Sequence, residues 1–369
     1  MWAVGLMTGT VLDGNIDVAL LRCNGDRVDT FGPDMLIPYR ASTLELLRQS
    51  LHEAQAWQFG SEEPAVFAEA QRQLTLEQSE AVLCLLEKAG LKTTEVGVVG
   101  FHGQTVLHRA PTALQLGATR QLGDGALMAE HLGIDVVHDF RSADMRGGGQ
   151  GAPLCAIYHR ALLEALGTDG DTAVLNLGGV ANLSFWDGAD KLIAFDTGPA
   201  NAPINDFVKQ HGNADFDRDG LLARTGQVDE LQLAKLLTHP YLYSDYPKSL
   251  DRFDFSASMA AGCALEDGCA LLTAFAAAAV GAGLDLLPFR PERLVVCGGG
   301  RHNKTLMREL AKRTGVQIVP AEQVGWVGDA LEAQCFAYLA VRVINSMPTS
   351  FPSTTGVRSA TVGGVVNRV

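Results

Sequence analysis

One local pattern occurs twice in this chain: a strand, a glycine-rich turn and two further strands. The first copy occupies residues 3–38 and has its turn at 8–14. The second begins with the apolar run 173–177 and Gly178-Gly179, and its two further strands end at residue 196. Apolar runs bounded by glycine are typical of strands. The repetition predicts two duplicated structural units, each bringing its first turn to one shared cleft.

Length and periodicity support the same division. A chain of 369 residues exceeds the usual size of one domain. Apolar residues three and four apart predict helices at 43–56, 63–89, 124–132, 202–210, 228–237, 268–284, 303–314 and 329–345. Further strands are expected at 95–101, 134–140, 293–297 and 316–319. The pattern indicates an α/β protein with domain I at 1–168, domain II at 169–345, and the segment 346–369 packing back on domain I.

Charge and hydropathy limit the partners that this chain is expected to bind. The formal net charge of −13 disfavours nucleic acid and an anionic membrane surface, because neither gains electrostatically from the contact. The alanine-rich run 271–287 is interrupted by Asp285 and by glycines, which favours a buried helix over a membrane span. The N-terminus has no basic region or cleavage site of a secretory signal. We therefore expect a cytoplasmic protein.

Three glycine-rich loops, at 9–14, 176–182 and 297–303, each follow a predicted strand. Glycines let backbone N–H groups approach phosphate oxygens closely, and the third loop also precedes a helix N-terminus. In the first loop, Thr10 is placed to bind a phosphate and Asp13 to hold Mg²⁺ directly or through water. Each loop alone is also compatible with an ordinary turn. The P-loop sequence Gly-x-x-x-x-Gly-Lys-Ser/Thr does not occur.

A carboxylate stands at the end of the third strand of the second half. Asp196 follows the apolar run 192–195 and precedes the turn sequence Thr197-Gly198-Pro199. A kinase uses a rigidly held carboxylate to hold metal or to orient and deprotonate the nucleophile. A structural role in the turn, or as a helix cap, is the alternative for Asp196.

Neutral polar residues of the first half are suited to binding sugar hydroxyls. His102, Gln104 and Thr105 directly follow a predicted strand, although His102 alone is also compatible with a buried core histidine. For Asp139, an ion pair with Arg141 and a sugar contact are equally supported. The sequence has no histidine pair at zinc-ligand spacing and no Gly-x-Ser-x-Gly, which disfavours a zinc or serine hydrolase.

Taken together, these segments resemble the anhydro-N-acetylmuramic acid kinase family, within the acetate and sugar kinase, Hsc70 and actin superfamily. The resemblance covers nearly the whole chain. It rests on residues 5–10, 100–105 with His108, 139–141, 148–154, 175–182, 196–199, 247–249, 297–300 with Asn303, and 332–333 with 336–337. So many matches in the same order are not expected by chance.

The resemblance implies two actin-like (ribonuclease H-like) domains flanking a nucleotide and sugar cleft. It implies that ATP, Mg²⁺ and water open the 1,6-anhydro bridge of anhydro-N-acetylmuramic acid and phosphorylate O6, giving N-acetylmuramic acid 6-phosphate for cell-wall recycling. Asp196 would be the catalytic base and Asp13 the metal ligand. The implied nucleotide contacts are Gly9, Thr10, Val11, Leu12, Asp13, Gly14, Asn15, Ile16, Gly178, Gly179, Asn182, Gly298, Gly299, Gly300 and Asn303. The implied sugar contacts are His102, Gln104, Thr105, Asp139, Arg141, Gln150 and Glu332.

The chain departs from the family's motifs at three places. In the first, Val11 replaces the serine of Gly-Thr-Ser-Leu-Asp-Gly, and Asn15 is inserted between this motif and Ile16. In the second, Ala200 replaces the second glycine of Gly-Pro-Gly-Asn. In the third, residues 250–253 differ from Thr-Gly-Arg-Glu. Two alternatives therefore stay open: a kinase for a different anhydro-sugar, and a non-enzymatic ATP-binding protein of the actin-like type. A glycoside hydrolase leaves the three glycine loops unexplained. The sequence leaves the oligomeric state open and is compatible with a homodimer.

Overall fold

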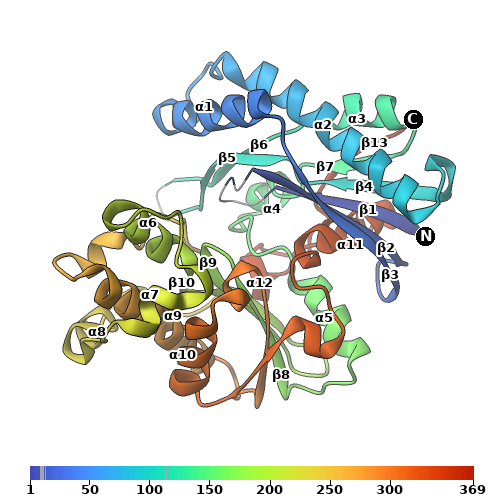
Figure 1. The fold of residues 1–369 in the computed structure, drawn as a ribbon. Helices are drawn as coiled ribbons and strands as arrows, with labels where there is room; N and C mark the ends of the chain where they lie inside the picture. Colours follow the sequence, from blue (N-terminus) through green and yellow to red (C-terminus); the bar gives the residue numbers. More distant parts are fainter. Residues whose placement is uncertain (9–11, 13, 113–114) are drawn as a thin grey trace. The chain divides into compact units, whose positions relative to one another are not determined.

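The computed structural model describes residues 1–8, 12, 14–112 and 115–369. The chain divides into two compact units (Figure 1). Unit 1 comprises residues 1–165 and 330–369, and unit 2 comprises residues 166–329. Four residues of the expected nucleotide loop, Gly9, Thr10, Val11 and Asp13, lie outside the described residues.

Unit 1 is built on a mixed sheet whose described strands have the order β13-β7-β4-β1-β2-β3. These strands are β1 (Trp2–Met7), β2 (Asn15–Cys23), β3 (Val28–Pro38), β4 (Val96–Phe101), β7 (Val136–His138) and β13 (Val365–Asn367). The first three form an antiparallel meander, while β4 and β7 run parallel to β1. A separate hairpin pairs β5 (Gln104–Arg109) with β6 (Ala118–Leu122).

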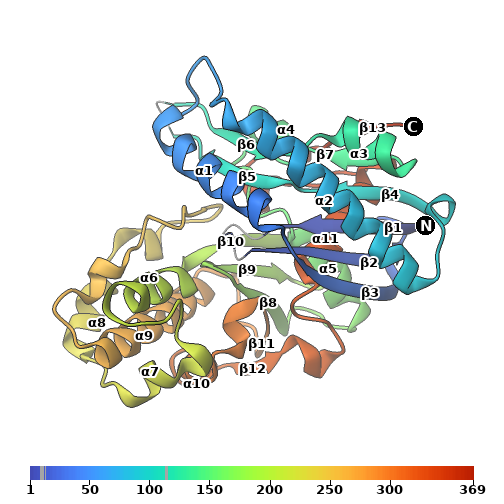
Figure 2. The ribbon, with the colours of Figure 1, turned by 45° about the horizontal axis from the view of Figure 1, so that its top comes forward.

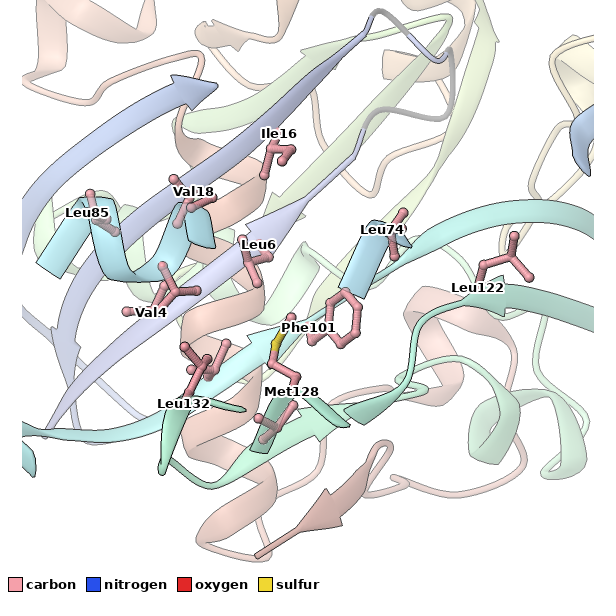
Figure 3. Close-up of a cluster of buried hydrophobic side chains, with 14 of the residues drawn as sticks. Val4, Leu6, Ile16, Val18, Leu74, Leu85, Phe101, Leu122, Met128 and Leu132 are labelled. Atoms are coloured by element: carbon pink, nitrogen blue, oxygen red, sulfur yellow. The ribbon is translucent and has the colours of Figure 1, made fainter. Parts of the chain in front are cut away.

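Helices cover both faces of this sheet. They are α1 (Ala41–Trp57), α2 (Val66–Ala89), α3 (Gly125–Leu132), α4 (Ser142–Arg146), α5 (Ala156–Ala165), α11 (Leu331–Ile344) and α12 (Pro352–Thr355), with a 3-10 turn at Thr93–Glu95. The side chains of Val4 and Leu6 on β1 belong to one buried apolar cluster with Leu74 and Leu85 of α2 (Figure 3). In Figure 2, α1 and α2 lie side by side.

The long helix α11 packs on the opposite face of β1 and β4. Successive side chains of a strand point to opposite faces, so Gly5 lies on the face away from Val4 and Leu6. A Cβ atom at Gly5 would overlap a backbone carbonyl oxygen of α11, and so would a Cβ atom at Gly100 of β4. This close approach explains why the units differ from the domain boundary expected from the sequence, which placed α11 in the second half.

Unit 2 has a five-stranded sheet among its described residues, in the order β10-β9-β8-β11-β12. Its strands are β8 (Thr172–Leu177), β9 (Val180–Trp186), β10 (Leu192–Pro199), β11 (Arg293–Cys297) and β12 (Gln317–Pro320). Its helices are α6 (Asn201–His211), α7 (Leu221–Thr225), α8 (Glu230–Leu236), α9 (Leu265–Leu284) and α10 (Lys304–Thr314). Short 3-10 turns lie at Arg218–Gly220, Pro240–Tyr243, Ala257–Ala260, Gly299–His302 and Ala321–Val324.

The two sheets share one topology, which confirms the predicted duplication. When the strands of each sheet are counted along the chain, five of them lie in the order third, second, first, fourth, fifth: β3-β2-β1-β4-β7 in unit 1 and β10-β9-β8-β11-β12 in unit 2. In each sheet the second strand is antiparallel to its two neighbours. In each, the fourth and fifth strands run parallel to the first. This is the ribonuclease H-like arrangement of actin-like domains, so the predicted fold class is confirmed.

Three segments differ in detail from the expectations. The strand expected at 134–140 is shorter, because Asp139 has a φ of 51° and its carboxylate accepts hydrogen bonds at the start of α4. The helix expected at 268–284 begins three residues earlier, at Leu265. In the C-terminal segment, β13 pairs antiparallel with β7, so this segment extends the sheet of unit 1.

The alanine-rich helix α9 is buried in unit 2, as the sequence predicts. Within the part of the chain that the structure describes, it is the one helix long and apolar enough to cross a membrane. However, 83% of its apolar window is buried inside the fold. Its apolar side chains therefore form part of the hydrophobic core of unit 2, where the helix packs against α6 and α10.

Candidate active site

Asp196 lies inside β10, which continues to Pro199 rather than ending at Asp196, and its carboxylate is held from two directions. Its side chain is mostly buried, with 8% of the residue's surface exposed. One carboxylate oxygen, Oδ1, accepts a hydrogen bond from Asn182 Nδ2 at 2.9 Å, and Oδ2 accepts one from the backbone N–H of Leu250 at 2.8 Å. Two donors, one on β9 and one in a loop, thus fix the direction of the carboxylate.

The backbone of Asp196 is held as firmly as its side chain. Its N–H donates to the carbonyl oxygen of Lys248 at 3.0 Å, and its own carbonyl accepts from the Tyr241 hydroxyl at 2.7 Å. The helix that follows has Ala200 as its N-cap, so Asp196 does not cap it. The helix-capping alternative for Asp196 is therefore wrong.

The Gly178-Gly179 turn is bound to the start of α6. The carbonyl oxygen of Gly179 accepts from the N–H groups of Ala200 and Ala202, and that of Gly178 accepts from Asn201. The Asn201 side chain also donates to Gly178 O at 2.7 Å. These bonds use the carbonyl groups of the turn. A Cβ at Gly178 would lie 3.7 Å from its nearest neighbour, the Val180 carbonyl oxygen, so the turn has room beside this residue.

The second turn of unit 2 follows β11, and its three glycines have different surroundings. Gly298 has a φ of 74°, and a Cβ there would overlap the Asn176 side chain. A Cβ at Gly300 would lie 2.6 Å from Leu177 Cβ. At Gly299, which is exposed, a Cβ would meet no atom within 4 Å. Gly298 and Gly300 are thus required by the protein's own packing, whereas Gly299 faces open space.

The two turns leave the sheet at the same edge. Strands β8 and β11 are parallel, and Asn176 is in register with Cys297, one residue before the Gly298 turn. The last residue of the expected nucleotide set here, Asn303, caps α10: its Oδ1 accepts from Leu306 N–H at 2.9 Å. Likewise, the Asn182 side chain is bonded to Asp196. For these two asparagines the structure gives a role within the protein, and a nucleotide contact stays a prediction.

In unit 1, His102 and Arg141 form a buried hydrogen-bonded pair. His102 Nδ1 donates to the Gly103 carbonyl at 2.7 Å, which leaves Nε2 to accept from Arg141 Nη2 at 3.0 Å. Burial, and then the charge of Arg141, lowers the pKa of His102 to about 3, so the ring is neutral. Arg141 Nη1 also donates to the Gly151 carbonyl at 2.7 Å. His102 therefore positions Arg141 in this structure.

The expected ion pair between Asp139 and Arg141 is not present among the described residues. Instead, Asp139 Oδ1 accepts from the Ser142 hydroxyl at 2.6 Å, while Arg141 is engaged by His102 and Gly151. Sequence proximity suggested the pair, but the left-handed backbone of Asp139 directs the two side chains differently. This leaves a sugar contact as the surviving prediction for Asp139.

A cavity of about 170 Å³ lies beside these residues in unit 1. Its lining residues are Phe101, His102, Thr119, Arg120, Gln121, Gly123, His138, Asp139 and Ser142. It contains His102 and Asp139 of the expected sugar set. The other five residues of that set are not among the lining residues. Gln104 is fully buried, Thr105 Oγ1 accepts a hydrogen bond from Gln121, and Arg141 is paired with His102 as described above. The backbone N–H of Gln150 donates to the Thr355 carbonyl, and Glu332 lies in the first turn of α11.

Comparison with known proteins gives a consistent result along the whole chain. The family model described as "Anhydro-N-acetylmuramic acid kinase" matches residues 1–368. A relative of that name from Mesorhizobium japonicum is 63% identical over 364 residues, covering 99% of this chain and 98% of the relative. One from Rhizobium rhizogenes is 61% identical with the same coverage, and one from Brucella anthropi is 60% identical.

The chain belongs to the anhydro-N-acetylmuramic acid kinase family. This membership confirms the predicted enzyme class, an ATP-dependent carbohydrate kinase that acts on a small-molecule sugar. It overturns the alternative of a non-enzymatic actin-like protein. The departures at Ala200 and at 250–253 thus occur within a family member: Ala200 N–H still bonds the Gly179 carbonyl, and Leu250 bonds Asp196 through its backbone.

Sequence reasoning missed one well-anchored residue of this kinase, Arg301. Its guanidinium is bidentate to Asp329, with contacts of 2.6 and 2.7 Å, and also donates to Glu322 and to the Gly298 carbonyl. Hydrogen bonds from Arg301 hold the pKa of Asp329 below its ordinary value. Arg301 thus secures the glycine turn to the segment that follows β12. The available signal was a basic residue directly after three glycines.

The structure does not test the proposed magnesium ligand. Within residues 1–8, 12, 14–112 and 115–369, no group of three or more His, Cys, Asp or Glu side chains is placed to hold a metal ion. Asp13, the predicted ligand, is outside this range. A kinase metal is commonly held by one or two carboxylates together with substrate phosphates, so a protein-only cluster is not required.

Proposed function

We propose that this enzyme opens the 1,6-anhydro bridge of anhydro-N-acetylmuramic acid with water and transfers the γ-phosphoryl group of ATP to O6. The products are N-acetylmuramic acid 6-phosphate and ADP. The observation that carries the proposal is the carboxylate of Asp196, which is mostly buried and oriented by Asn182 and Leu250. Because ATP is the co-substrate, we place the reaction in the cytoplasm, where it would serve cell-wall recycling.

In the proposed mechanism, Asp196 accepts a proton from water while the water oxygen bonds to the anomeric carbon. The bond between that carbon and O6 breaks, and O6 takes the γ-phosphoryl group as ADP leaves. Water attacks an acetal carbon poorly unless its proton is removed, and O6 leaves poorly unless its developing charge is captured. General-base assistance contributes roughly 10²- to 10⁴-fold, and capture of O6 by phosphoryl transfer supplies the second requirement.

The nucleotide is proposed to bind beside Gly178 and Gly299, where glycine leaves room for an approaching ligand. Two observations support this proposal: a Cβ at Gly299 would meet open space, and the turns after β8 and β11 leave the sheet at the same end of these parallel strands. The loop at 9–14 is also proposed to contact the nucleotide, with Asp13 as the residue that would hold Mg²⁺. When bound, Mg²⁺ neutralises phosphate charge. His102, Arg141 and the other residues of the expected sugar set remain the proposed sugar contacts.

Isotopic labelling of the products tests this function. The enzyme is incubated with MgATP and anhydro-N-acetylmuramic acid in ¹⁸O-labelled water, and the products are analysed promptly by mass spectrometry. We expect one ADP per sugar phosphate, with ¹⁸O in the sugar and none in its phosphate group. Label in inorganic phosphate without sugar phosphate would indicate simple ATP hydrolysis. Ring opening without ATP would indicate a glycoside hydrolase.

A panel of anhydro-sugars in the same assay addresses the identity of the substrate. The departures at 250–253 lie next to Asp196, because Leu250 N–H bonds its carboxylate. If anhydro-N-acetylmuramic acid is the substrate, its kcat/KM should exceed those of analogues that lack the lactyl or N-acetyl group. Faster turnover of another anhydro-sugar would retain the reaction type and replace the sugar.

A further inference from the structure

The segment 241–250 contacts Asp196 at three of its polar groups. Tyr241, at the start of the segment, donates its hydroxyl hydrogen to the Asp196 carbonyl, and Lys248 accepts from the Asp196 N–H. Leu250, at the end of the segment, donates its N–H to the carboxylate. The direction of the carboxylate therefore depends on how this segment is folded.

Lys248 closes the segment on itself. Its ammonium group donates to the carbonyl oxygens of Tyr241 at 2.8 Å and Leu242 at 3.2 Å, the two middle residues of the 3-10 turn Pro240–Tyr243. It also lies 4.7 Å from the centre of the Tyr241 ring and 5.6 Å from that of Phe195. The residue is 6% exposed. A buried ammonium group is costly unless it is paired in this way, so these contacts tie the two ends of the segment together.

We propose that Lys248 is a positioning residue for the catalytic base: its ammonium group holds the Tyr241 end and the Leu250 end of the segment together and thereby fixes the carboxylate of Asp196. The inference rests on the proposed role of Asp196 as that base. Lys248 does not itself act on the substrate in this scheme. Its effect on the reaction passes through the Leu250 N–H, which orients Oδ2 of Asp196.

A second anchor allows this role to be separated from folding of the segment. Arg252 Nη2 donates to both carboxylate oxygens of Asp206 on α6, at 3.0 and 2.9 Å. This contact remains when the Lys248 ammonium group is removed. Loss of Lys248 should therefore loosen the part next to Asp196, while the chain just after the segment stays attached to α6 through Arg252.

The test compares Lys248→Met, which keeps an apolar stem of similar length, with Lys248→Arg, which restores charged donors. A misplacement of about 1 Å in a catalytic group can cost roughly 10²-fold. We expect Lys248→Met to lower kcat roughly 10- to 100-fold, with the KM for ATP unchanged and one ATP still bound per chain. Lys248→Arg should recover most of this loss. The matched control is Lys209→Met, an exposed lysine on α6, which should leave kcat unchanged.

A double-mutant cycle shows whether the effect passes through Asp196. In the Asp196→Asn background, Lys248→Met should reduce kcat by less than about twofold, because the base is already absent. A full additional loss in that background, or turnover of Lys248→Met within twofold of the parent, would overturn the positioning role. If Asp196→Asn alone retains parental turnover, the proposed function fails instead. Should Lys248→Met not fold, Lys248→Gln, which retains an N–H donor, is held to the same kcat criteria.

Discussion

At the scale of single residues, the environment of Asp196 is built for an anion. Among the described residues, the Asn182 amide and the Leu250 N–H both donate hydrogen bonds to its carboxylate. A carboxylate accepts at both oxygens, whereas an amide accepts at one position and donates at the other. The site therefore distinguishes aspartate from its amide by hydrogen bonding as well as by charge.

Replacing Asp196 by asparagine tests the base directly. We expect Asp196→Asn to lower turnover by roughly 10²- to 10⁴-fold, the usual effect of losing a general base. ATP binding, measured by calorimetry, should be retained. One donor would face the new amide NH₂ group, so a loss of stability of about 1 kcal/mol is also expected.

The control for this variant is Asp187→Asn. Asp187 also accepts two backbone hydrogen bonds, from Ala189 and Lys191, but in the turn between β9 and β10. Its substitution should leave turnover at the parental rate. If Asp196→Asn behaves in the same way, then Asp196 has only a structural role in β10 and another group removes the proton.

At the scale of elements, the packing of α11 on the sheet of unit 1 depends on strand residues that have no side chain. Gly100 of β4 lies against the backbone of α11, where a Cβ would overlap the Phe336 carbonyl oxygen. Backbone atoms in a helix cannot rotate away as the end of a long side chain can. Any added carbon must therefore displace the helix or the strand.

We expect Gly100→Ala to destabilise the protein by about 1–3 kcal/mol or more, the usual cost of overpacking a core. Urea unfolding monitored by circular dichroism measures the change. Gly299→Ala is the matched control, because its Cβ meets no atom within 4 Å and its stability should stay within about 0.5 kcal/mol of the parent. Equal stability of the two variants would mean that α11 is not held this tightly against β4.

The elements also show what the sequence could and could not predict. The positions of the strands along each half could be predicted, because glycine turns and apolar runs are local signals. The partner of α11 could not be predicted from periodicity, which marks an apolar helix face without naming the sheet that covers it. The roles of Asn182 and Asn303 were similarly hidden: both lie in glycine loops, but their side chains bond to Asp196 and to the N-terminus of α10.

For the molecule as a whole, buried histidines make stability depend on pH. Burial lowers the pKa of His159 to about 4. For His102 and His108, burial is the main cause and the charge of Arg141 the second, and together they lower the pKa to about 3 and about 4, respectively. In the unfolded chain a histidine takes up a proton near pH 6.5. Between about pH 6.5 and 4 the unfolded state therefore binds more protons than the folded state.

It follows that the free energy of unfolding should fall as the pH decreases through this window. Each such histidine contributes a slope of up to about 1.4 kcal/mol per pH unit. Urea midpoints at pH 7.5, 6 and 5 measure the dependence. His159→Gln should make it shallower, whereas His131→Gln, at an exposed position of α3, should not. A midpoint independent of pH across this range would contradict the predicted proton linkage.

Unit 1 is assembled from both ends of the chain, and this has a consequence for its biosynthesis. All strands of the unit 2 sheet lie between Thr172 and Pro320, so that sheet is complete in the nascent chain before α11 has been made. Strands β1 and β4 emerge from the ribosome first, but the helix that packs against Gly5 and Gly100 is translated after residue 330. We therefore expect the second unit to fold before the first is finished, the reverse of the usual N-terminal-first order. Until α11 has been translated, the face of the unit 1 sheet that this helix covers remains accessible to chaperones.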